Sequence, residues 1–205
     1  MFNKYNFKII DFATKKQNNP EITGIYFNSK KETIATDSIT LIRLESPDLD
    51  SKDFPILPDK SKALKAFKPF ILSPEGAKKI LKVIPEKNAS LPILENTILV
   101  EQKENMVDFA TTDLESFNRV KTRTIIGDFP DYKKMLTKNG KHIKVSVNVK
   151  YLKKIVNFLD SFNDNTIDKL DFEIPFDTNN QPIRFYGDRN GQKCEVLLMS
   201  IRQNH

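Results

Sequence analysis

The chain has 205 residues, of which 39% are hydrophobic and 15 are Phe, so it can bury one large core or two small ones. It has no apolar run near the roughly 18 residues that a bilayer crossing needs, no secretory signal pattern and one cysteine, which argues against a membrane span and an internal disulfide and predicts a cytoplasmic protein. The net charge of +6, from 33 basic and 27 acidic residues, permits nucleic-acid binding, but many unrelated basic proteins share it.

The first part of the chain, residues 1–67, predicts a β meander. Residues 22–28, 32–37 and 39–45 are short runs rich in β-branched residues with alternating polarity. The stretch that follows, residues 46–62, contains three prolines and four aspartates. Such a composition predicts an exposed connection rather than a packed element.

The second part, residues 68–136, predicts a strand at 68–72 and a basic amphipathic helix at 73–85. Ser73 suits the N-cap position, Pro74 the first helical position, and Pro85 ends the helix. Three lysines lie off its apolar stripe: Lys78, Lys79 and Lys82. Strand patterns then follow at 96–102, 106–112 and 116–126.

The third part, residues 137–205, repeats this pattern with a predicted strand at 143–149 and a predicted helix at 149–162. Beside the apolar stripe of this helix lie three more lysines: Lys150, Lys153 and Lys154. Further strands are predicted at 169–176, 182–188 and 193–202. The Asn-Gly pair at 190–191 predicts a tight hairpin turn between the last two.

The first two parts resemble each other, which indicates an internal repeat. The stretch from Pro20 to Asp37 matches the stretch from Pro92 to Asp113, since both are meanders that end in a Thr-Asp turn. Short alternating strands also look alike without a common origin, so convergent hairpin composition is the alternative.

Four short segments carry a resemblance to a known family. IATD at 34–37, ATTDLE at 110–115, GDFPDYKKML at 127–136 and LLMSIR at 197–202 occur in this order. Together they resemble the bacterial DNA sliding clamp, the beta subunit of DNA polymerase III. The resemblance implies an α+β fold of repeated β-α-β-β-β modules, with antiparallel sheets and few helices.

The resemblance also implies a domain organisation. Residues 1–136 would form one clamp-like domain, made of a module at 1–67 whose first strand and helix are missing or much shortened and a module at 68–136. Residues 137–205 would form a further module, similar to the one that closes the family's C-terminal domain. Residues 90–115 resemble instead the opening module of its N-terminal domain, so the parent of the second module stays open.

A sliding clamp is a ring without chemistry of its own, so the resemblance implies a non-enzymatic DNA replication processivity factor without cofactor or metal. It would encircle double-stranded DNA as a homo-oligomer. The DNA-binding residues would be the helix lysines: Lys78, Lys79, Lys82, Lys150, Lys153 and Lys154. A solvated helix face explains the same lysines without any ligand.

In the family, a pocket between two domains binds the peptide tails of polymerases and clamp loaders. Matched residue by residue, the pocket positions here are Ile22, Thr36, Ile39, Leu41, Pro130, Met135, Leu197, Leu198, Met199, Ile201 and Arg202. An apolar groove lined by Ile, Leu and Met suits a short linear peptide. The alternative is that these apolar residues belong to the core.

Two other functions remain open. An enzyme could use the carboxylates of Asp108, Asp113 and Glu115 or the pair Asp164 and Asp168, but Asp in turns commonly bonds its own backbone, and no P-loop or nucleophile motif accompanies them. A monomeric clamp-like adaptor or decoy could bind replication proteins without encircling DNA. The oligomeric state separates this second possibility from a ring.

Overall fold

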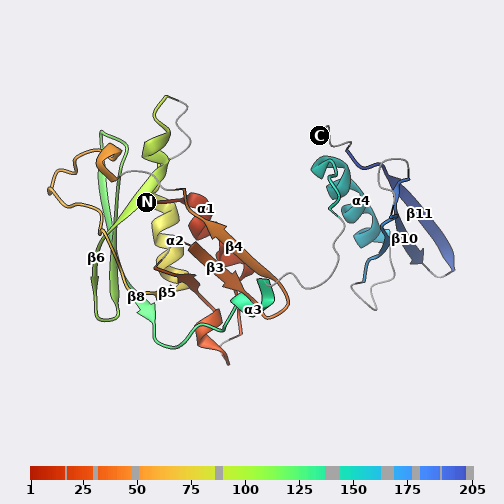
Figure 1. Cartoon of the computed structure of the whole chain (residues 1–205), viewed down its shortest axis with the longest axis horizontal. Coiled ribbons are helices and arrows are strands. Elements are labelled where there is room, and N and C mark those ends of the chain that lie inside the picture. Colours follow the sequence, from red (N-terminus) through yellow and green to blue (C-terminus); the bar gives the residue numbers. More distant parts are fainter. Residues whose placement is uncertain are drawn as a thin grey trace. The chain divides into compact units, whose positions relative to one another are not determined.

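The computed structural model describes residues 1–16, 18–29, 32–47, 51–85, 90–136, 144–162, 169–176, 181–189 and 191–201. Contacts between Cα atoms divide the chain into two compact units, Met1–Leu136 (unit 1) and Thr137–His205 (unit 2), shown in Figure 1. Unit 1 contains an eight-stranded sheet and unit 2 a three-stranded sheet.

Unit 1 passes twice through the order strand, helix and three strands. The first module contains β1 (Phe2–Asn3), α1 (Lys4–Lys8), β2 (Ile25–Phe27), β3 (Glu32–Thr36) and β4 (Leu41–Glu45). The second module contains β5 (Phe70–Leu72), α2 (Pro74–Val83), β6 (Asn96–Lys103), β7 (Met106–Thr112) and β8 (Phe117–Ile125), and is followed by α3 (Lys133–Leu136). Single 3-10 turns lie at Ile9–Phe12, Pro20–Ile22, Ser51–Asp53 and Pro92–Glu95. The first strand and helix are therefore present but short.

The two modules exchange their first strands. The strand order is β1-β6-β7-β8-β5-β2-β3-β4, and every neighbouring pair is antiparallel. Strand β1 of the first module pairs with β6 of the second, and β5 of the second pairs with β2 of the first. Strand β5 also pairs with β8 of its own module. Each module therefore completes the sheet of the other.

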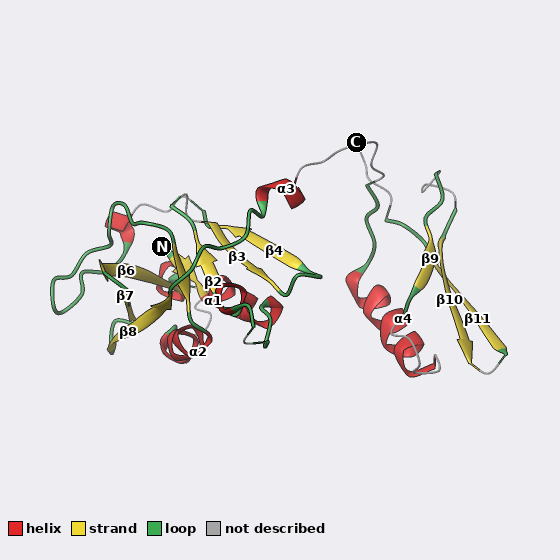
Figure 2. Ribbon diagram, turned by 90° about the horizontal axis from the view of Figure 1, so that it is seen from below, coloured by secondary structure: helices red, strands yellow, loops and turns green. Residues whose placement is uncertain are grey.

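The main core of unit 1 lies between this sheet and its two helices, which Figure 2 shows on the same side of the strands. Phe7 of α1 and Phe27 of β2 are 0% exposed, and Phe109 of β7 is 1% exposed. Their rings meet edge to face or tilted, with the Phe7 and Phe109 centroids 5.5 Å apart. Buried aromatic rings contribute both large apolar area and specific ring contacts, so this cluster holds the helices on the sheet.

Gly76 sets how closely α2 approaches the sheet. A Cβ at this position would lie 2.8 Å from Oγ1 of Thr122 on β8, closer than packed atoms allow. The helix begins as predicted, because Ser73 is its N-cap and its hydroxyl accepts a hydrogen bond of 3.1 Å from Gly76 N–H. Local capping and a missing side chain together fix the position of α2.

The opposite face of the sheet is covered by the connection between the modules. Phe54 and Leu57, which are 5% and 1% exposed, pack against Ile98 of β6 and Ala110 of β7. The prediction of an exposed connection at 46–62 is therefore wrong for this part. The prolines indicated irregular backbone correctly, but the apolar side chains between them fill a second small core.

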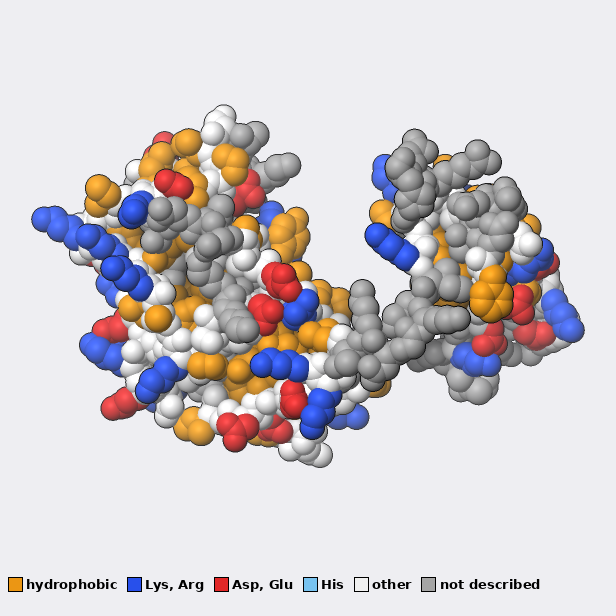
Figure 3. Space-filling view, in the orientation of Figure 1, with side chains coloured by type: hydrophobic (Ala, Val, Ile, Leu, Met, Phe, Trp, Pro, Cys, Tyr) orange, Lys and Arg blue, Asp and Glu red, His pale blue; other side chains and the backbone are white. Residues whose placement is uncertain are grey.

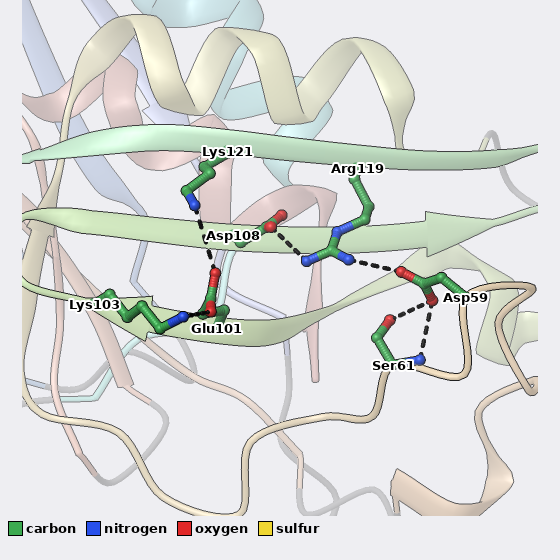
Figure 4. A network of polar contacts seen from close by, with 7 residues as sticks. All are labelled: Asp59, Ser61, Glu101, Lys103, Asp108, Arg119 and Lys121. Carbon is green, nitrogen blue, oxygen red and sulfur yellow. Dashed lines mark hydrogen bonds and ion pairs between the residues drawn. The ribbon is translucent and has the colours of Figure 1, made fainter.

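Arg119 fastens this connection to the sheet (Figure 4). From β8 it donates hydrogen bonds of 2.7 Å to Oδ2 of Asp59 and 2.6 Å to Oδ2 of Asp108 on β7. The Asp108 side chain is only 6% exposed, and its Oδ1 has no hydrogen-bond partner among the described residues. The bond to Asp108 raises the pKa of Arg119, and the Ser61 side chain, followed by its backbone N–H, lowers the pKa of Asp59.

The predicted internal repeat is confirmed by two matching turns. Thr36 Oγ1 donates to Thr40 O at 2.6 Å, and Thr112 Oγ1 donates to Ser116 O at 2.7 Å. In each turn the Asp that follows the Thr accepts backbone N–H bonds, which lower its pKa. The next residue has a φ of 78° in both turns. Composition alone does not require the same bonds at the same offsets.

Unit 2 contains one helix and three described strands. These are α4 (Val149–Phe162), β9 (Asp171–Glu173), β10 (Ile183–Arg189) and β11 (Gln192–Leu198), with the strand order β11-β10-β9. The predicted helix at 149–162 is confirmed. The predicted hairpin is also confirmed, because Arg189 pairs with Gln192 and Gly191 has a φ of 85°, although Asn190 lies outside the described residues.

The strand predicted at 143–149 is wrong. Residues 144–148 form no strand, and the helix already begins at Val149. Val145 and Val147 pack against the small core of unit 2, and Ser146 O accepts a 2.7 Å hydrogen bond from Ile201 N–H. The apolar residues of the alternating pattern therefore make core contacts, but no neighbouring strand among the described residues pairs with them through a backbone hydrogen-bond ladder.

We expect Arg119→Ala to lower the free energy of unfolding of unit 1 by about 2 kcal/mol, because the buried Asp108 carboxylate loses its charged partner. Hydrogen exchange of the β7 and β8 amides in the full chain measures the change for unit 1 alone. Lys103→Ala is the matched control, since Lys103 bonds Glu101 in the same sheet but is exposed (Figure 4). Equal losses for both variants would contradict a special role for Arg119.

Candidate nucleic-acid and peptide-binding surfaces

The predicted lysines of the second module lie on the exposed side of α2. Lys78, Lys79 and Lys82 are exposed, whereas Ala77 and Ile80 are 0% exposed and face the core. None of the three lysines forms an ion pair with another residue in the described part of the chain. Their charges are therefore not neutralised by the described residues of unit 1, and the helix presents them away from the sheet.

The first module adds lysines to the same side of unit 1. Lys4 and Lys8 of α1 lie with their Nζ atoms 5.7 Å from the ring centroid of Tyr5, and α1 packs against α2. Lys15 and Lys78 also line a groove of about 780 Å³ beside the start of α2. These first-module lysines were not predicted. The available signal was the spacing of Lys4 and Lys8, one helical turn apart.

The opposite side of the sheet has a different electrostatic character. On β8, Arg119, Lys121 and Arg123 are exposed and alternate with Val120 and Thr122, which face α2 and the main core. Arg119 binds two aspartates and Lys121 lies 3.5 Å from Glu101. Among the described residues, Arg119 and Lys121 of the strand side are thus paired with carboxylates while Lys78, Lys79 and Lys82 of the helix side are not, which suits phosphate contacts on the helix side.

Helix α4 of unit 2 has the same arrangement. Lys150, Lys153 and Lys154 are exposed, and Ile155 and Leu159, which are 7% and 1% exposed, face the sheet. Exposed lysine side chains can contact phosphates in any sequence, because such contacts use charge and not base edges. Figure 3 shows Lys and Arg side chains at the visible surface of each unit.

The predicted pocket residues of unit 1 differ in exposure. Ile22 and Thr36 are buried, at 4% and 5%, and the Thr36 hydroxyl is used in the Thr-Asp turn. Ile39 is 89% exposed in that turn, Leu41 is half-buried at the start of β4, and Pro130 is exposed. Met135 lies in α3, and its side chain is outside the described residues.

The segment that contains Pro130 is docked on the first module. The Phe129 ring stacks on Tyr26 with centroids 4.8 Å apart. The Tyr132 hydroxyl accepts a 3.0 Å hydrogen bond from Asn28 and donates one of 3.1 Å to Glu32, and burial raises the pKa of Tyr132. These contacts explain the Phe and Tyr of the quoted motif as structural residues that position its exposed proline.

A groove of about 840 Å³ lies next to this docked segment. Its lining includes Tyr26, Phe70 and Phe129, together with Leu64 and residues 66–69 and 124–128. None of the predicted pocket residues lines this groove. It is an additional concave surface of unit 1 that the sequence did not indicate.

In unit 2 the predicted residues follow the alternation of an extended chain. Leu197, Met199 and Ile201 are 54%, 55% and 51% exposed, whereas Leu198 between them is buried in the core. Residues two apart in an extended chain share a side, so the three exposed side chains form one apolar stripe. Arg202 lies outside the described residues.

Two of the carboxylates that suggested an enzyme have structural roles, whereas Glu115 is exposed. Asp108 binds Arg119, and Asp113 holds its own turn together. Asp164 and Asp168 lie outside the described residues. Across the described ranges, no group of three or more His, Cys, Asp and Glu side chains gathers as a metal site would. The helices of the described ranges are all too short or too polar to cross a bilayer.

Solved structures identify the fold. No protein-family model and no curated protein matches the sequence. The chain is similar to the DNA polymerase sliding clamp of Pseudomonas aeruginosa, with a TM-score of 0.65 at 14% identity over 97% of this chain and 50% of that one. The DNA polymerase III beta subunit of Borrelia burgdorferi gives 0.67 at 13%, over 96% and 45%. The H. pylori beta clamp gives 0.58 at 17%, over 100% and 48%.

The chain therefore has the sliding-clamp fold, and the predicted α+β class of antiparallel sheets with few helices is confirmed. It spans about half the length of the clamp chains that it matches. At these sequence identities the structural similarity establishes the fold alone. A function has to be inferred from the lysine and apolar surfaces described above.

Tyr132→Phe tests whether the hydroxyl holds the docked segment. We expect a loss of about 1 kcal/mol in the local opening free energy of residues 127–136, because two hydrogen bonds disappear. Hydrogen exchange measures this loss. Tyr5→Phe, at an exposed ring, should leave the exchange of the same residues unchanged. Unchanged exchange in Tyr132→Phe would show that ring packing alone positions the segment.

Proposed function

We propose that this protein is a non-catalytic, clamp-like processivity factor of DNA replication, which encircles double-stranded DNA in the cytoplasm as a homo-oligomer. The observation that carries the proposal is the row of exposed lysines on the helix side of a clamp-fold unit, Lys78, Lys79 and Lys82, which form no ion pair with any described residue. Residues 1–136 would act as a clamp-like domain of two modules and residues 137–205 as a further module. DNA would be held by topology and weak phosphate contacts.

The lysines suit this role because their contacts would be weak and independent of sequence. Each lysine that contacts a phosphate releases a condensed counterion and adds to a salt-dependent affinity. A protein that moves along DNA must not read base edges, and the helix surface presents Lys78, Lys79 and Lys82 without an accompanying pattern of Asn, Gln or Arg for bases. Lys150, Lys153 and Lys154 would act in the same way on α4.

Tethering of a polymerase would use the apolar stripe of unit 2. Leu197, Met199 and Ile201 present adaptable apolar side chains on one side of an extended chain, which is the kind of surface that binds short linear peptides. Ile39, Leu41 and Pro130 are the exposed or half-exposed candidates of unit 1. The partners would be peptide tails of a DNA polymerase and of its clamp loader.

The second candidate is a monomeric adaptor or decoy. The exposed stripe of Leu197, Met199 and Ile201 favours it, because peptide binding by this stripe needs no ring. A ring requires several copies joined by closing contacts. Light scattering on a size-exclusion column decides: a discrete closed oligomer supports the ring, and a strict monomer supports the adaptor.

We expect Lys78→Glu with Lys82→Glu to weaken duplex binding and to reduce the slope of log affinity against log salt by about 0.9 for each lysine that contacts a phosphate. Fluorescence anisotropy of a labelled duplex at several salt concentrations measures both quantities. Lys121→Glu with Arg123→Glu is the matched control, with the same charge change on the strand side. Equal effects of both pairs would contradict a DNA-facing helix side.

We expect Met199→Asp to abolish binding of a peptide copied from the clamp-binding tail of a bacterial replicative polymerase, because a charge replaces the centre of the apolar stripe. Calorimetry with the folded full chain measures this. Ile56→Asp, at a 91% exposed side chain of unit 1 outside the proposed pocket, is the control. Retained binding by Met199→Asp would remove the stripe from the pocket.

A further inference from the structure

Unit 2 follows the same order as the modules of unit 1, but it has no second module beside it in the described chain. Its strand-like segment 144–148 precedes α4, and three strands follow. In unit 1, the first strand β5 lies between β8, the last strand of its own module, and β2, the second strand of the other module, whereas β1 pairs with β6 of the other module at the end of the sheet. This arrangement gives a template for unit 2.

One side of the template is present in unit 2. Strand β5 pairs with the end of β8, where Ile71 is opposite Ile125. In unit 2, Ser146 of the first segment accepts a hydrogen bond from Ile201, just beyond the end of β11. Residues 144–148 therefore already lie beside the end of their own module.

The other side of the template is missing. Strand β9 is the counterpart of β2 and β6, each of which pairs with the first strand of the other module. In unit 2, β9 is an edge strand that pairs with β10 among the described residues. Among the described residues, 144–148 form no ladder and β9 pairs on one side only, so a strand-like segment outside any ladder and a sheet edge occur in the same module.

The apolar surface of unit 2 fits the same conclusion. Helix α4 packs over β10 and β11, and Phe172 of β9 is 53% exposed although it stacks on the core residue Phe185. Tyr151 and Phe158 of α4, two helical turns apart, are 62% and 48% exposed. In unit 1 the corresponding place is filled, because α1 and α2 pack against each other over one core.

We infer that unit 2 binds a second copy of itself and completes a two-module domain across a two-fold axis. Residues 144–148 of each copy pair with β9 of the other, and the two α4 helices pack side by side. The exchange in unit 1 is reciprocal, which is the relation that a two-fold axis imposes on identical surfaces.

This dimer rests on the homo-oligomer of the proposed function, and the cross-linking experiment below separates the two, because a ring closed through other contacts would give an oligomer without this cross-link. Light scattering of the full 23.7 kDa chain across a concentration series should give twice that mass. Tyr151→Glu with Phe158→Glu should return the protein to the mass of one chain, and Ile56→Glu in unit 1 should not. A monomer at every concentration, or an unchanged oligomer in the double variant, overturns the inference.

Cysteine cross-linking tests the strand exchange directly and does not require a destabilising charge. Chains with Phe172→Cys are mixed with chains that carry one cysteine at positions 144–148 in turn, all in a Cys194→Ser background. Opposed positions on paired strands bring Cβ atoms within disulfide range, so at least one position should give a covalent dimer of unlike chains. Leu197→Cys, on β11, replaces Phe172→Cys in the control and should give none. If the protein is an oligomer but no position gives a cross-link, the interface lies elsewhere and the strand exchange is contradicted.

Discussion

The reciprocal exchange of first strands between the two modules is the constraint on which unit 1 depends. Strand β5 has only three residues, yet it joins β8 to β2 and so turns two separate meanders into one sheet. Phe70 on this strand stacks on Phe27 with centroids 4.8 Å apart, so the same residues supply hydrogen bonds and core. Neither module could cover Phe27 and Phe109 alone, since their neighbours come from both.

The exchange also determines the surface on which the proposed function rests. Because the modules are joined through their first strands, the helix that follows each first strand is brought to the same side of the sheet. The lysines of α1 and α2 then share one surface, and the strand residues that point the other way meet carboxylates from β6, β7 and the connection. The topology therefore places the helix lysines on one side of the sheet and the paired cations and carboxylates on the other, although basic and acidic residues are intermixed along the sequence.

The sequence predicted best what neighbouring residues decide. The N-cap Ser73, the two helices and the repeated Thr-Asp turns depend on contacts within about one turn, and all are confirmed. Burial of Phe54 and Leu57 was missed because their partners lie about 40 and 50 residues away in the chain on β6 and β7. Among the pocket candidates, alternation predicts which of residues 197–201 share a side, but it does not say which side faces a core.

The segment 144–148 shows most clearly where sequence and structure diverge. Its alternating Val145 and Val147 satisfy the pattern of a strand and do face apolar neighbours, yet a strand also needs a partner edge. The same kind of segment becomes β5 in unit 1 because β2 is present beside it. Strand β9, an edge strand among the described residues, carries Asp171 and Glu173 on either side of Phe172, and charged side chains on an edge discourage indiscriminate pairing. A short, charged edge of this kind favours one specific partner strand over general aggregation. Residues 144–148 of a second copy suit this role, because among the described residues they form no ladder.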